Sequence, residues 1–189
     1  REGVLSLKVV EKLNGIESPE GYRLNVNKRG VEIQATSGAG LFYGVQTLLQ
    51  MSYDSKKISC VEITDGPRFA YRGFMLDVSR HFFGKEVVKK QIDAMAYYKL
   101  NRLHLHLTDA AGWRIEIKRY PRLTNFAAWR DKLIWKEWWN TGRLYKNEGE
   151  EGAFGGYYTQ EDIKELVAYA QKHYITIIPE IEMPAHSEE

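Results

Sequence analysis

The first third of the chain alternates apolar and polar positions with a period of two. The apolar members of this alternation are Leu5, Leu7 and Val9, then Tyr22, Leu24 and Val26, and then Val31, Ile33 and Ala35. A period of two predicts strands that bury one face, and the residues NKRG at 27–30 are typical of a hairpin connection. We therefore predict an antiparallel sheet that is covered on one side.

A helical period follows these strands. In AGLFYGVQTLLQM, at 39–51, the apolar residues recur at helical spacing, and they are Leu41, Val45, Leu48 and Leu49. This helix is expected to cover the sheet. One more strand is predicted over 58–63, and TDGPRFAYRG then interrupts the pattern with Gly66 and Pro67. The pattern predicts a small α+β domain over 1–65 and a second domain over 66–189.

From residue 66 onward, predicted strands and helices alternate. Strands are expected over 72–78, 101–107 and 174–182, with helices over 85–100 and from Thr159 onward. Each helix has one apolar face, and the two faces are Val88, Ile92, Met95 and Ala96, and Ile163, Leu166, Val167 and Ala170. A capping box of Thr159 and Asp162 predicts the start of the second helix. This order of elements predicts parallel βαβ units.

The long connection over 108–158 breaks the alternation. It is rich in tryptophan, with Trp129, Trp135, Trp138 and Trp139, and it contains the Gly- and Glu-rich stretch NEGEEGAFGG. Connections of this length within a compact domain are usually functional or disordered. An indole offers a flat apolar face to a sugar ring, but tryptophans also pack a loop against itself. The sequence leaves both interpretations open.

Composition and charge exclude several classes of partner. The chain has 27 Lys and Arg residues against 25 Asp and Glu residues, so no basic stripe predicts a nucleic-acid partner. Cys60 is the only cysteine, which excludes an internal disulfide framework and a zinc site built on several thiolates. No apolar run predicts a membrane span. The start, REGVLSLKVV, has neither Met nor a signal-like stretch, so we expect it to lie downstream of any targeting segment.

Each of the three strands predicted after residue 66 ends in polar side chains. The three groups are Asp77, Ser79, Arg80 and His81; His106, Thr108 and Asp109; and Glu180, Glu182 and His186. In parallel α/β folds, and in (β/α) barrels above all, substrate sites lie at the carboxyl ends of the strands. The three groups together therefore predict a polar site.

Several of these residues also have a structural interpretation. Arg80 is a suitable partner for a carboxylate, and Asp109 is a suitable turn or cap residue. His104 and His106 alternate with leucines, so either is consistent with a core histidine, and we favour that interpretation for His104. The strand that carries Glu180 and Glu182 is apolar enough to be buried, and a buried carboxylate needs a partner.

A metal site is a further alternative for the same residues. His106, Asp109 and His186 are residue types that bind metal ions. No HExxH motif or comparable spacing with a third ligand accompanies the pair His104 and His106. We predict no metal.

Several segments, in order along the chain, resemble the signatures of the β-N-acetylhexosaminidases of glycoside hydrolase family 20. They are GPRFAYRGFMLDVSRHFF, KLNRLHLHLTDAAGWRIEIKRYPRLT, GGYYTQEDIKELVAYA and IIPEIEMPAHS. The earlier segment GYRLNVNKRGVEIQATSGAGLFYGVQTLLQ resembles the small domain that precedes the barrel in this family. The resemblance implies an α/β fold: a partial (β/α)8 TIM barrel of about three strands, preceded by an α+β domain.

The resemblance also implies an activity. Family 20 enzymes remove terminal N-acetylglucosamine or N-acetylgalactosamine from glycans with retention, and the substrate's own acetamido oxygen attacks the anomeric carbon. One carboxylate orients the acetamido group, and a neighbouring Glu is the general acid. The implied partner is an N-acetylhexosamine-terminated oligosaccharide or glycan, with no cofactor. A periplasmic or secreted location is the expectation for the family.

Residue by residue, the resemblance implies a sugar-binding set. The family's sugar-binding Arg falls on Arg80, where a planar guanidinium would bind ring hydroxyls. Its Asp after strand two falls on Asp109, and its His after strand three falls on His186. His106 and Glu182 match recurring positions and are expected to support the other three.

The sequence departs from the family pattern in two places near these residues. Ala110 and Ala111 stand where many relatives have a second acidic residue after Asp109, so a loop contact is expected to be lost. Ala185 stands where many relatives have Gly, which would restrict the backbone beside His186 if a positive φ is needed there.

The family's catalytic Asp-Glu pair lies after strand four. Glu161 and Asp162 do not replace it, because they lie in the first turn of a predicted helix. We therefore expect no catalytic acid in this chain, with the pair beyond residue 189, and no activity from the chain alone. A non-catalytic glycan-binding module is the alternative. Three strands of an expected eight would leave two open edges, through which the fragment is expected to self-associate.

Overall fold

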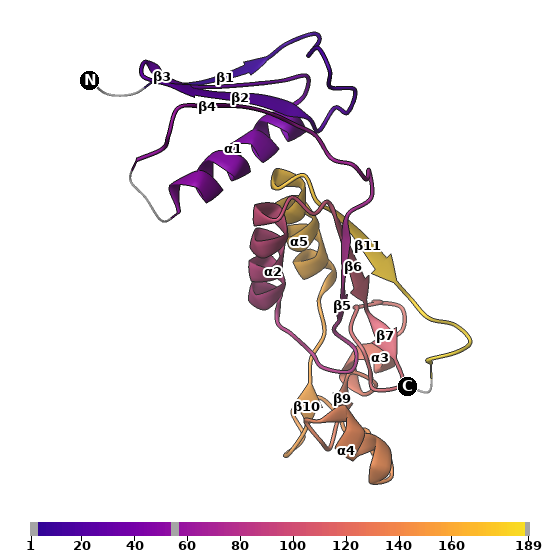
Figure 1. Cartoon of the computed structure of the whole chain (residues 1–189). Coiled ribbons are helices and arrows are strands. Elements are labelled where there is room, and N and C mark those ends of the chain that lie inside the picture. The colour runs from indigo at the N-terminus through magenta and orange to yellow at the C-terminus, as the bar shows by residue number, and fades with distance from the viewer. Residues whose placement is uncertain (1–3, 54–56, 188–189) are drawn as a thin grey trace. The chain divides into compact units, whose positions relative to one another are not determined.

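The structure is a computed structural model that describes residues 4–53 and 57–187. It divides into two compact units. The first unit is the chain up to Arg72 together with Ala96–Lys99, and the second is Gly73–Met95 together with the chain from Leu100 onward. Most elements of both units are labelled in Figure 1.

The first unit contains a four-stranded sheet in the order β1-β3-β2-β4. Its strands are β1 (Val4–Val9), β2 (Tyr22–Asn27), β3 (Gly30–Ala35) and β4 (Val61–Asp65). β2 is antiparallel to β3 and to β4, and the predicted hairpin is present, since Asn27 pairs with Gly30. β1 differs from the prediction, because it pairs with β3 in parallel. The long connection over 10–21 allows this, whereas a tight hairpin would have placed β1 antiparallel to β2.

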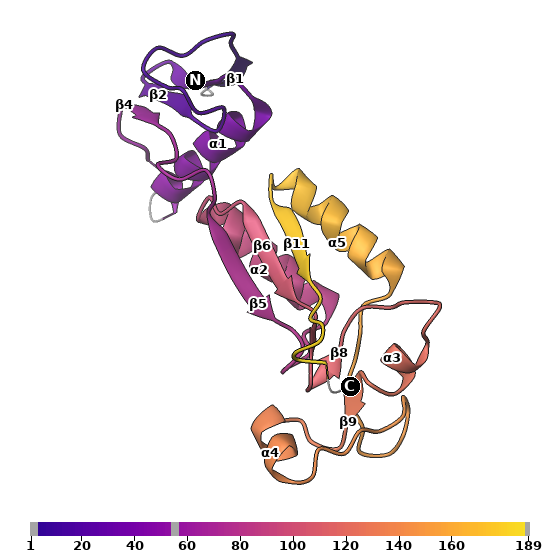
Figure 2. The same cartoon turned by 90° about the vertical axis from the view of Figure 1, so that its right-hand side faces the viewer.

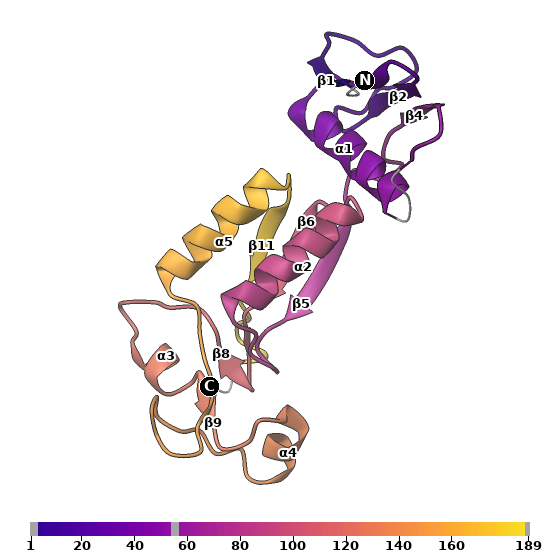
Figure 3. The same cartoon turned by 90° about the vertical axis from the view of Figure 1, so that its left-hand side faces the viewer.

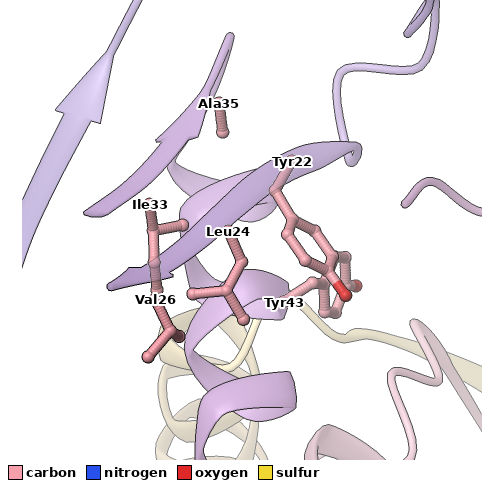
Figure 4. Close-up of a cluster of buried hydrophobic side chains, with 6 residues drawn as sticks. All are labelled: Tyr22, Leu24, Val26, Ile33, Ala35 and Tyr43. Atoms are coloured by element: carbon pink, nitrogen blue, oxygen red, sulfur yellow. The ribbon is translucent and has the colours of Figure 1, made fainter. Parts of the chain in front are cut away.

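One face of this sheet carries the core of the first unit. The buried cluster, drawn in Figure 4, is Tyr22, Leu24 and Val26 of β2, Ile33 and Ala35 of β3, and Tyr43 of helix α1 (Gly38–Ser52). The predicted period of two is thus confirmed for β2 and β3. On β1 the same pattern leaves Leu5, Leu7 and Val9 exposed, because α1 packs over β2 and β3 and β1 is an edge strand.

Helix α1 is present as predicted, but its buried face differs from the predicted one. Its buried residues include Gly40 and Gly44, where an added side chain would overlap atoms of the sheet and its connections. Three of the four predicted apolar residues pack at the edge of the core cluster, and the fourth, Leu49, is exposed. The pattern of side chains missed this face because glycine contributes no side chain to the pattern.

The second unit contains a parallel three-stranded sheet in the order β11-β6-β5. The strands are β5 (Gly73–Asp77), β6 (Arg102–His106) and β11 (Thr176–Glu180). Helices α2 (Lys85–Tyr97) and α5 (Gln160–Lys172) connect them and lie on the same face of the sheet, as Figures 2 and 3 show from opposite sides. The predicted βαβ units are therefore confirmed.

The predicted faces of α2 and α5 and the predicted cap of α5 are also present. All four predicted apolar residues of α2 are buried, and on α5 the buried residues are Leu166 and Ala170. Thr159 and Asp162 form the predicted capping box. None of the helices among the described residues is long and apolar enough to cross a membrane.

The connection between β6 and α5 is folded and lies at the carboxyl ends of the three parallel strands (Figure 1). Its short elements are β7 (Thr108–Asp109), β8 (Gly112–Trp113), α3 (Arg122–Asn125), β9 (Trp129–Arg130), α4 (Trp135–Asn140) and β10 (Phe154–Gly155). β7 pairs with β8, and β9 pairs with β10, both antiparallel. The connection is therefore part of the structure around the strand ends, where a site is predicted.

Candidate functional site

The register of the parallel sheet brings three charged residues into one row. Asp77 of β5 pairs with His106 of β6, and His106 pairs with Glu180 of β11. Since alternate residues of a strand point to the same face, these side chains share a face, opposite to that of the buried Leu105. Residues far apart in sequence thus meet at the carboxyl end of the sheet.

Asp109 is the centre of the cluster that forms above this row. Its side chain is buried, and its Oδ2 lies 2.5 Å from Arg80 Nη2, 3.1 Å from His106 Nε2 and 3.1 Å from His186 Nδ1. Arg80 also donates from Nη1 to Asp77 Oδ2 at 2.5 Å. The structure therefore brings together four of the five predicted site residues. Asp109 pairs with three cationic or imidazole groups, which a turn or cap residue would not do.

His106 is held between two carboxylates. Its Nδ1 lies 2.7 Å from Glu180 Oε2, and its Nε2 faces Asp109. Burial would lower the pKa of His106, but the hydrogen bonds to Glu180 and Asp109 outweigh burial and raise this pKa above its usual value. For Glu180, burial would raise the pKa, yet the bond from His106 lowers it. A protonated imidazole that donates from both nitrogens fits this position.

His104 differs from the core histidine predicted for its position. About a third of its side chain is exposed, and its Nε2 lies 2.8 Å from Glu180 Oε2. It points to the same open face of the sheet as Met75, its register partner on β5, which is also exposed. The buried residues of β6 on the other face are Leu103 and Leu105.

Glu182 and His186 follow β11 and occupy different positions. The backbone amide of Glu182 donates to Thr108 Oγ1 at 2.8 Å, and a carboxyl oxygen of Glu182 lies within 4.8 Å of His106 and Glu180, so Glu182 meets the cluster at its edge. His186 contacts Asp109 directly, while 53% of its side chain remains exposed. The backbone φ of His186 is 54°, and the residue with positive φ is therefore His186 and not Ala185. An alanine at position 185 is compatible with this conformation.

One group of side chains in the described part of the chain is compact enough to hold a metal ion. Ligand atoms of His106, Glu180 and Glu182 all lie within 4.8 Å of one another. Both imidazole nitrogens of His106 already face carboxylates, so a metal would have to displace one of these bonds. The absence of a metal stays a prediction.

Two buried arginines hold the connection to the strand ends by hydrogen bonds. The sequence analysis did not predict them. Arg114 donates five hydrogen bonds to backbone carbonyls, those of Val78, Ser79, Ala111, Ala128 and Gly156. Arg130 donates to the carbonyls of Arg80, Ala111, Lys132 and Leu133. They fix the backbone on both sides of Asp109. No spacing in the sequence marks them, since each simply follows a tryptophan.

A cavity of about 380 Å³ opens beside Asp109. One part of its wall is Arg80, Asp109 and His186, and another is Trp135 and Trp139 of α4. Ligand cavities in proteins commonly have volumes of about 300 to 1,000 Å³. The combination of guanidinium donors, a carboxylate acceptor and indole rings suits a ligand with hydroxyl groups and an apolar face.

The two alanines that depart from the family pattern also line this cavity. Ala110 and Ala111 are buried, and their carbonyls are bound by side chains of the connection: Tyr145 donates to Ala110, and Arg114 and Arg130 donate to Ala111. The second acidic group of many relatives is therefore replaced by a small apolar wall. Asp109 is the acidic residue that lines the cavity.

Parallel strands that end in a cluster of Arg, Asp and His side chains beside a cavity define a (β/α)-type ligand site, the kind found in barrel enzymes. Comparison with known families narrows this class. Residues 69–189 match the model of glycosyl hydrolase family 20, catalytic domain, and residues 2–66 match the model of its domain 2. The chain belongs to glycoside hydrolase family 20, as the resemblance predicted, and the predicted fold class is confirmed with it.

Individual relatives agree with this assignment. The chain is 47% identical over 178 residues to a beta-hexosaminidase of Porphyromonas gingivalis, covering 89% of this chain and 21% of that protein. It is 41% identical over 187 residues to a beta-hexosaminidase of Vibrio furnissii, covering 96% of this chain and 29% of that protein. A crystal structure of the exo beta-N-acetylglucosaminidase of Vibrio harveyi with N-acetylglucosamine matches with a TM-score of 0.80 and 40% identity, over 96% of this chain and 28% of that one. The chain thus spans less than a third of each of these relatives.

Proposed function

We propose that the full-length protein, meaning the complete product of the gene that encodes this chain, is an exo-acting β-N-acetylhexosaminidase. It releases terminal N-acetylglucosamine or N-acetylgalactosamine from a glycan with retention. The observation that carries this proposal is the cluster of Arg80, His106, Asp109 and His186 beside a cavity of ligand size. Membership of family 20 supports it.

In this proposal Arg80 and Asp109 bind the hydroxyl groups of the terminal sugar. A planar guanidinium presents several N–H donors in fixed directions, which suits neighbouring hydroxyls on a ring. Arg80 is already oriented by Asp77 and Asp109, so it loses little freedom when the sugar binds. Asp109 keeps oxygen lone pairs for a hydroxyl donor, since a carboxylate accepts about four hydrogen bonds.

His186 has a separate role in the proposal. In the tautomer with a proton on Nδ1, this nitrogen donates to Asp109, and Nε2 becomes the acceptor on the exposed side of the ring. Asp109 therefore both binds the sugar and orients His186. His186 then holds a polar group of the substrate or of the general acid in place.

The general acid is proposed to come from outside these residues. Asp77 and Asp109 are paired with Arg80, and Glu180 is paired with two histidines, so the polar partners of these carboxylates are already within the cluster. The chemical step is substrate-assisted, with the acetamido oxygen as the nucleophile. We propose that this chain positions the sugar but is inactive by itself.

The test measures release of p-nitrophenol from p-nitrophenyl N-acetylglucosaminide by the full-length protein. Arg80→Ala is expected to lower kcat/KM by about 100-fold or more, because charged hydrogen bonds to the sugar are lost. Arg119→Ala is the matched control, since Arg119 is an exposed arginine of the same unit. Equal turnover by wild type and Arg80→Ala would overturn the role of Arg80.

A non-catalytic glycan-binding module is the second candidate, favoured by the observation that the carboxylates of Asp77, Asp109 and Glu180 are paired with cationic or imidazole groups. It predicts saturable binding of N-acetylglucosamine in calorimetry, lost in Arg80→Ala, with no turnover by the full-length protein. Turnover by the wild-type protein would exclude it.

We also propose that the chain divides into an α+β domain over 1–65 and barrel sequence over 66–189, with support from the two family models that adjoin near residue 66. We also propose a periplasmic or secreted location.

A further proposal is self-association through the edges of the parallel sheet. The exposed side chains of Phe74 and Met75 on the edge strand β5 support self-association. Cell fractionation tests the location, and light scattering tests the self-association.

A further inference from the structure

Helix α4 presents its tryptophans on two different sides. Trp138 is fully buried, and its indole N–H donates to the carbonyl of Leu144 at 3.0 Å. Trp135 and Trp139 are four residues apart and therefore neighbours on one side of the helix. Both of them line the cavity beside Asp109. Trp138 anchors the helix, and the other two tryptophans form part of the cavity wall.

Packing of the connection against itself explains three of its tryptophans. The indole N–H of Trp113 donates to the carbonyl of Ile115 at 2.5 Å, and that of Trp129 donates to the carbonyl of Thr124 at 2.9 Å. Trp138 is bonded in the same way. Within the described part of the chain, neither Trp135 nor Trp139 has such an acceptor, and Trp139 is 40% exposed. These two side chains are therefore available to a ligand.

Cationic groups hold both rings in defined orientations. The guanidinium carbon of Arg80 lies 5.8 Å from the ring centroid of Trp135, and that of Arg143 lies 3.5 Å from the ring centroid of Trp139. Contacts of this kind are attractive because the face of an indole is electron-rich. Trp135 thus lies directly beside the guanidinium proposed to bind sugar hydroxyls.

The position of α4 relative to Asp109 is fixed from both ends of the helix. Before α4, Arg130 donates to the carbonyl of Leu133, and after α4, Tyr145 donates to the carbonyl of Ala110 at 2.6 Å. Ala110 is the neighbour of Asp109 in sequence. A rigid aromatic wall at a fixed position suits recognition better than a mobile loop would.

We infer that Trp135 and Trp139 form a stacking surface for the apolar face of the terminal N-acetylhexosamine ring. The C–H groups of a sugar ring lie on its faces and the hydroxyls on its rim, so one ring can contact the indoles while its hydroxyls reach Arg80 and Asp109. The two tryptophans are binding residues that determine how tightly the terminal sugar is held. This inference rests on the proposed function.

The test compares KM and kcat of Trp135→Leu and Trp139→Leu in the full-length protein with p-nitrophenyl N-acetylglucosaminide. Each substitution is expected to raise KM by about tenfold, as for the loss of one aromatic stacking contact. The change in kcat is expected to be smaller for Trp139→Leu, because Trp139 contacts Arg143 and not Arg80. Trp139→Phe should restore most of the affinity. Tyr120→Leu removes an exposed aromatic side chain of the same connection outside the cavity and should leave KM unchanged.

A second readout does not depend on turnover. Titration with N-acetylglucosamine is expected to change the intrinsic tryptophan fluorescence of the wild type. The double variant Trp135→Phe, Trp139→Phe should lose this change, although it still binds the sugar with lower affinity. If the wild type neither hydrolyses the substrate nor binds the sugar, the proposed function fails. If the wild type does both and the tryptophan variants keep its KM and its fluorescence change, this inference alone is wrong.

Discussion

The first unit and the connection over 108–158 are both ordered, but different interactions hold them together. In the first unit, apolar side chains of β2, β3 and α1 meet in one buried cluster. In the connection, the buried guanidinium groups of Arg114 and Arg130 donate hydrogen bonds to backbone carbonyls that lie outside the strands. The first arrangement has a period in the sequence, and the second has none.

The two kinds of interaction also serve different purposes, since one stabilises a fold and the other fixes the geometry of a site. A hydrophobic core tolerates many sequences of similar volume, so it specifies a fold more than an exact geometry. Hydrogen bonds from one guanidinium to several carbonyls fix distances and directions. The connection needs such bonds, because it sets the positions of Asp109 and α4 at the cavity wall.

The largest effect is predicted for Arg114→Met. Loss of the guanidinium leaves the carbonyls of Val78, Ser79 and Gly156 without their donor, at a cost of ~1 to 3 kcal/mol for each group, so the connection is expected to lose about 4 kcal/mol of local stability. Hydrogen exchange read by mass spectrometry on peptides from 108–158 measures this. Arg119→Met, at an exposed position, is the control and should change protection by less than ~0.5 kcal/mol. Equal protection in the two variants would show that Arg114 does not fasten the connection.

A smaller loss is predicted for Leu24→Ala in the first unit. Leu24 is fully buried in the core cluster, and truncation of a buried leucine costs ~2 to 5 kcal/mol, centred on about 3 kcal/mol. Exchange should rise in peptides from β2 and β3. Asn25→Ala, on the opposite face of the same strand, is the control. Equal exchange in both variants would show that burial of Leu24 does not stabilise this sheet.

The smallest predicted effect is the dependence of stability on pH through His106 and Glu180. The pKa of His106 is raised above 6.5, so its contribution to stability is complete below 6.5 and is lost as pH rises through the folded-state value. The pKa of Glu180 is lowered below 4.5, so its contribution is complete above 4.5 and is lost as pH falls through the folded-state value. The pair is therefore expected to be most stable between about pH 4.5 and 6.5.

An NMR titration of the His106 ring proton measures this prediction. The expected midpoint lies above 6.5, and the resonance is assigned by its loss in His106→Gln. A midpoint at or below 6.5 would mean that burial outweighs the two carboxylates. Glu180→Gln should lower the midpoint, since it removes the charge nearest to Nδ1.

Much of the fold was predictable because its elements obey simple periods. The alternation of Tyr22, Leu24 and Val26, and the capping box at Thr159, are local patterns that predicted the elements correctly. The parallel pairing of β1 was not predictable, because it depends on a connection whose path no period describes. The buried glycines of α1 were missed for a related reason, since a packing face without side chains leaves no apolar pattern.

The site was predictable in part. Arg80, His106, Asp109 and His186 lie at or after strand ends, and parallel strands bring their ends together, so the four could be grouped before their contacts were known. The wall formed by Trp135 and Trp139 could only be suggested, because it depends on how Arg130 and Tyr145 fold the connection back over Asp109. Buried arginines that bind carbonyls have no sequence signature.

The proposed role of the cluster around Asp109 is to bind the terminal sugar. A crystal structure of the full-length protein with N-acetylglucosamine tests it most directly. The sugar is expected in the cavity, with its hydroxyls within hydrogen-bonding distance of Arg80 and Asp109 and one face of its ring against Trp135 or Trp139. A sugar bound elsewhere, with the cavity beside Asp109 unchanged, would contradict it.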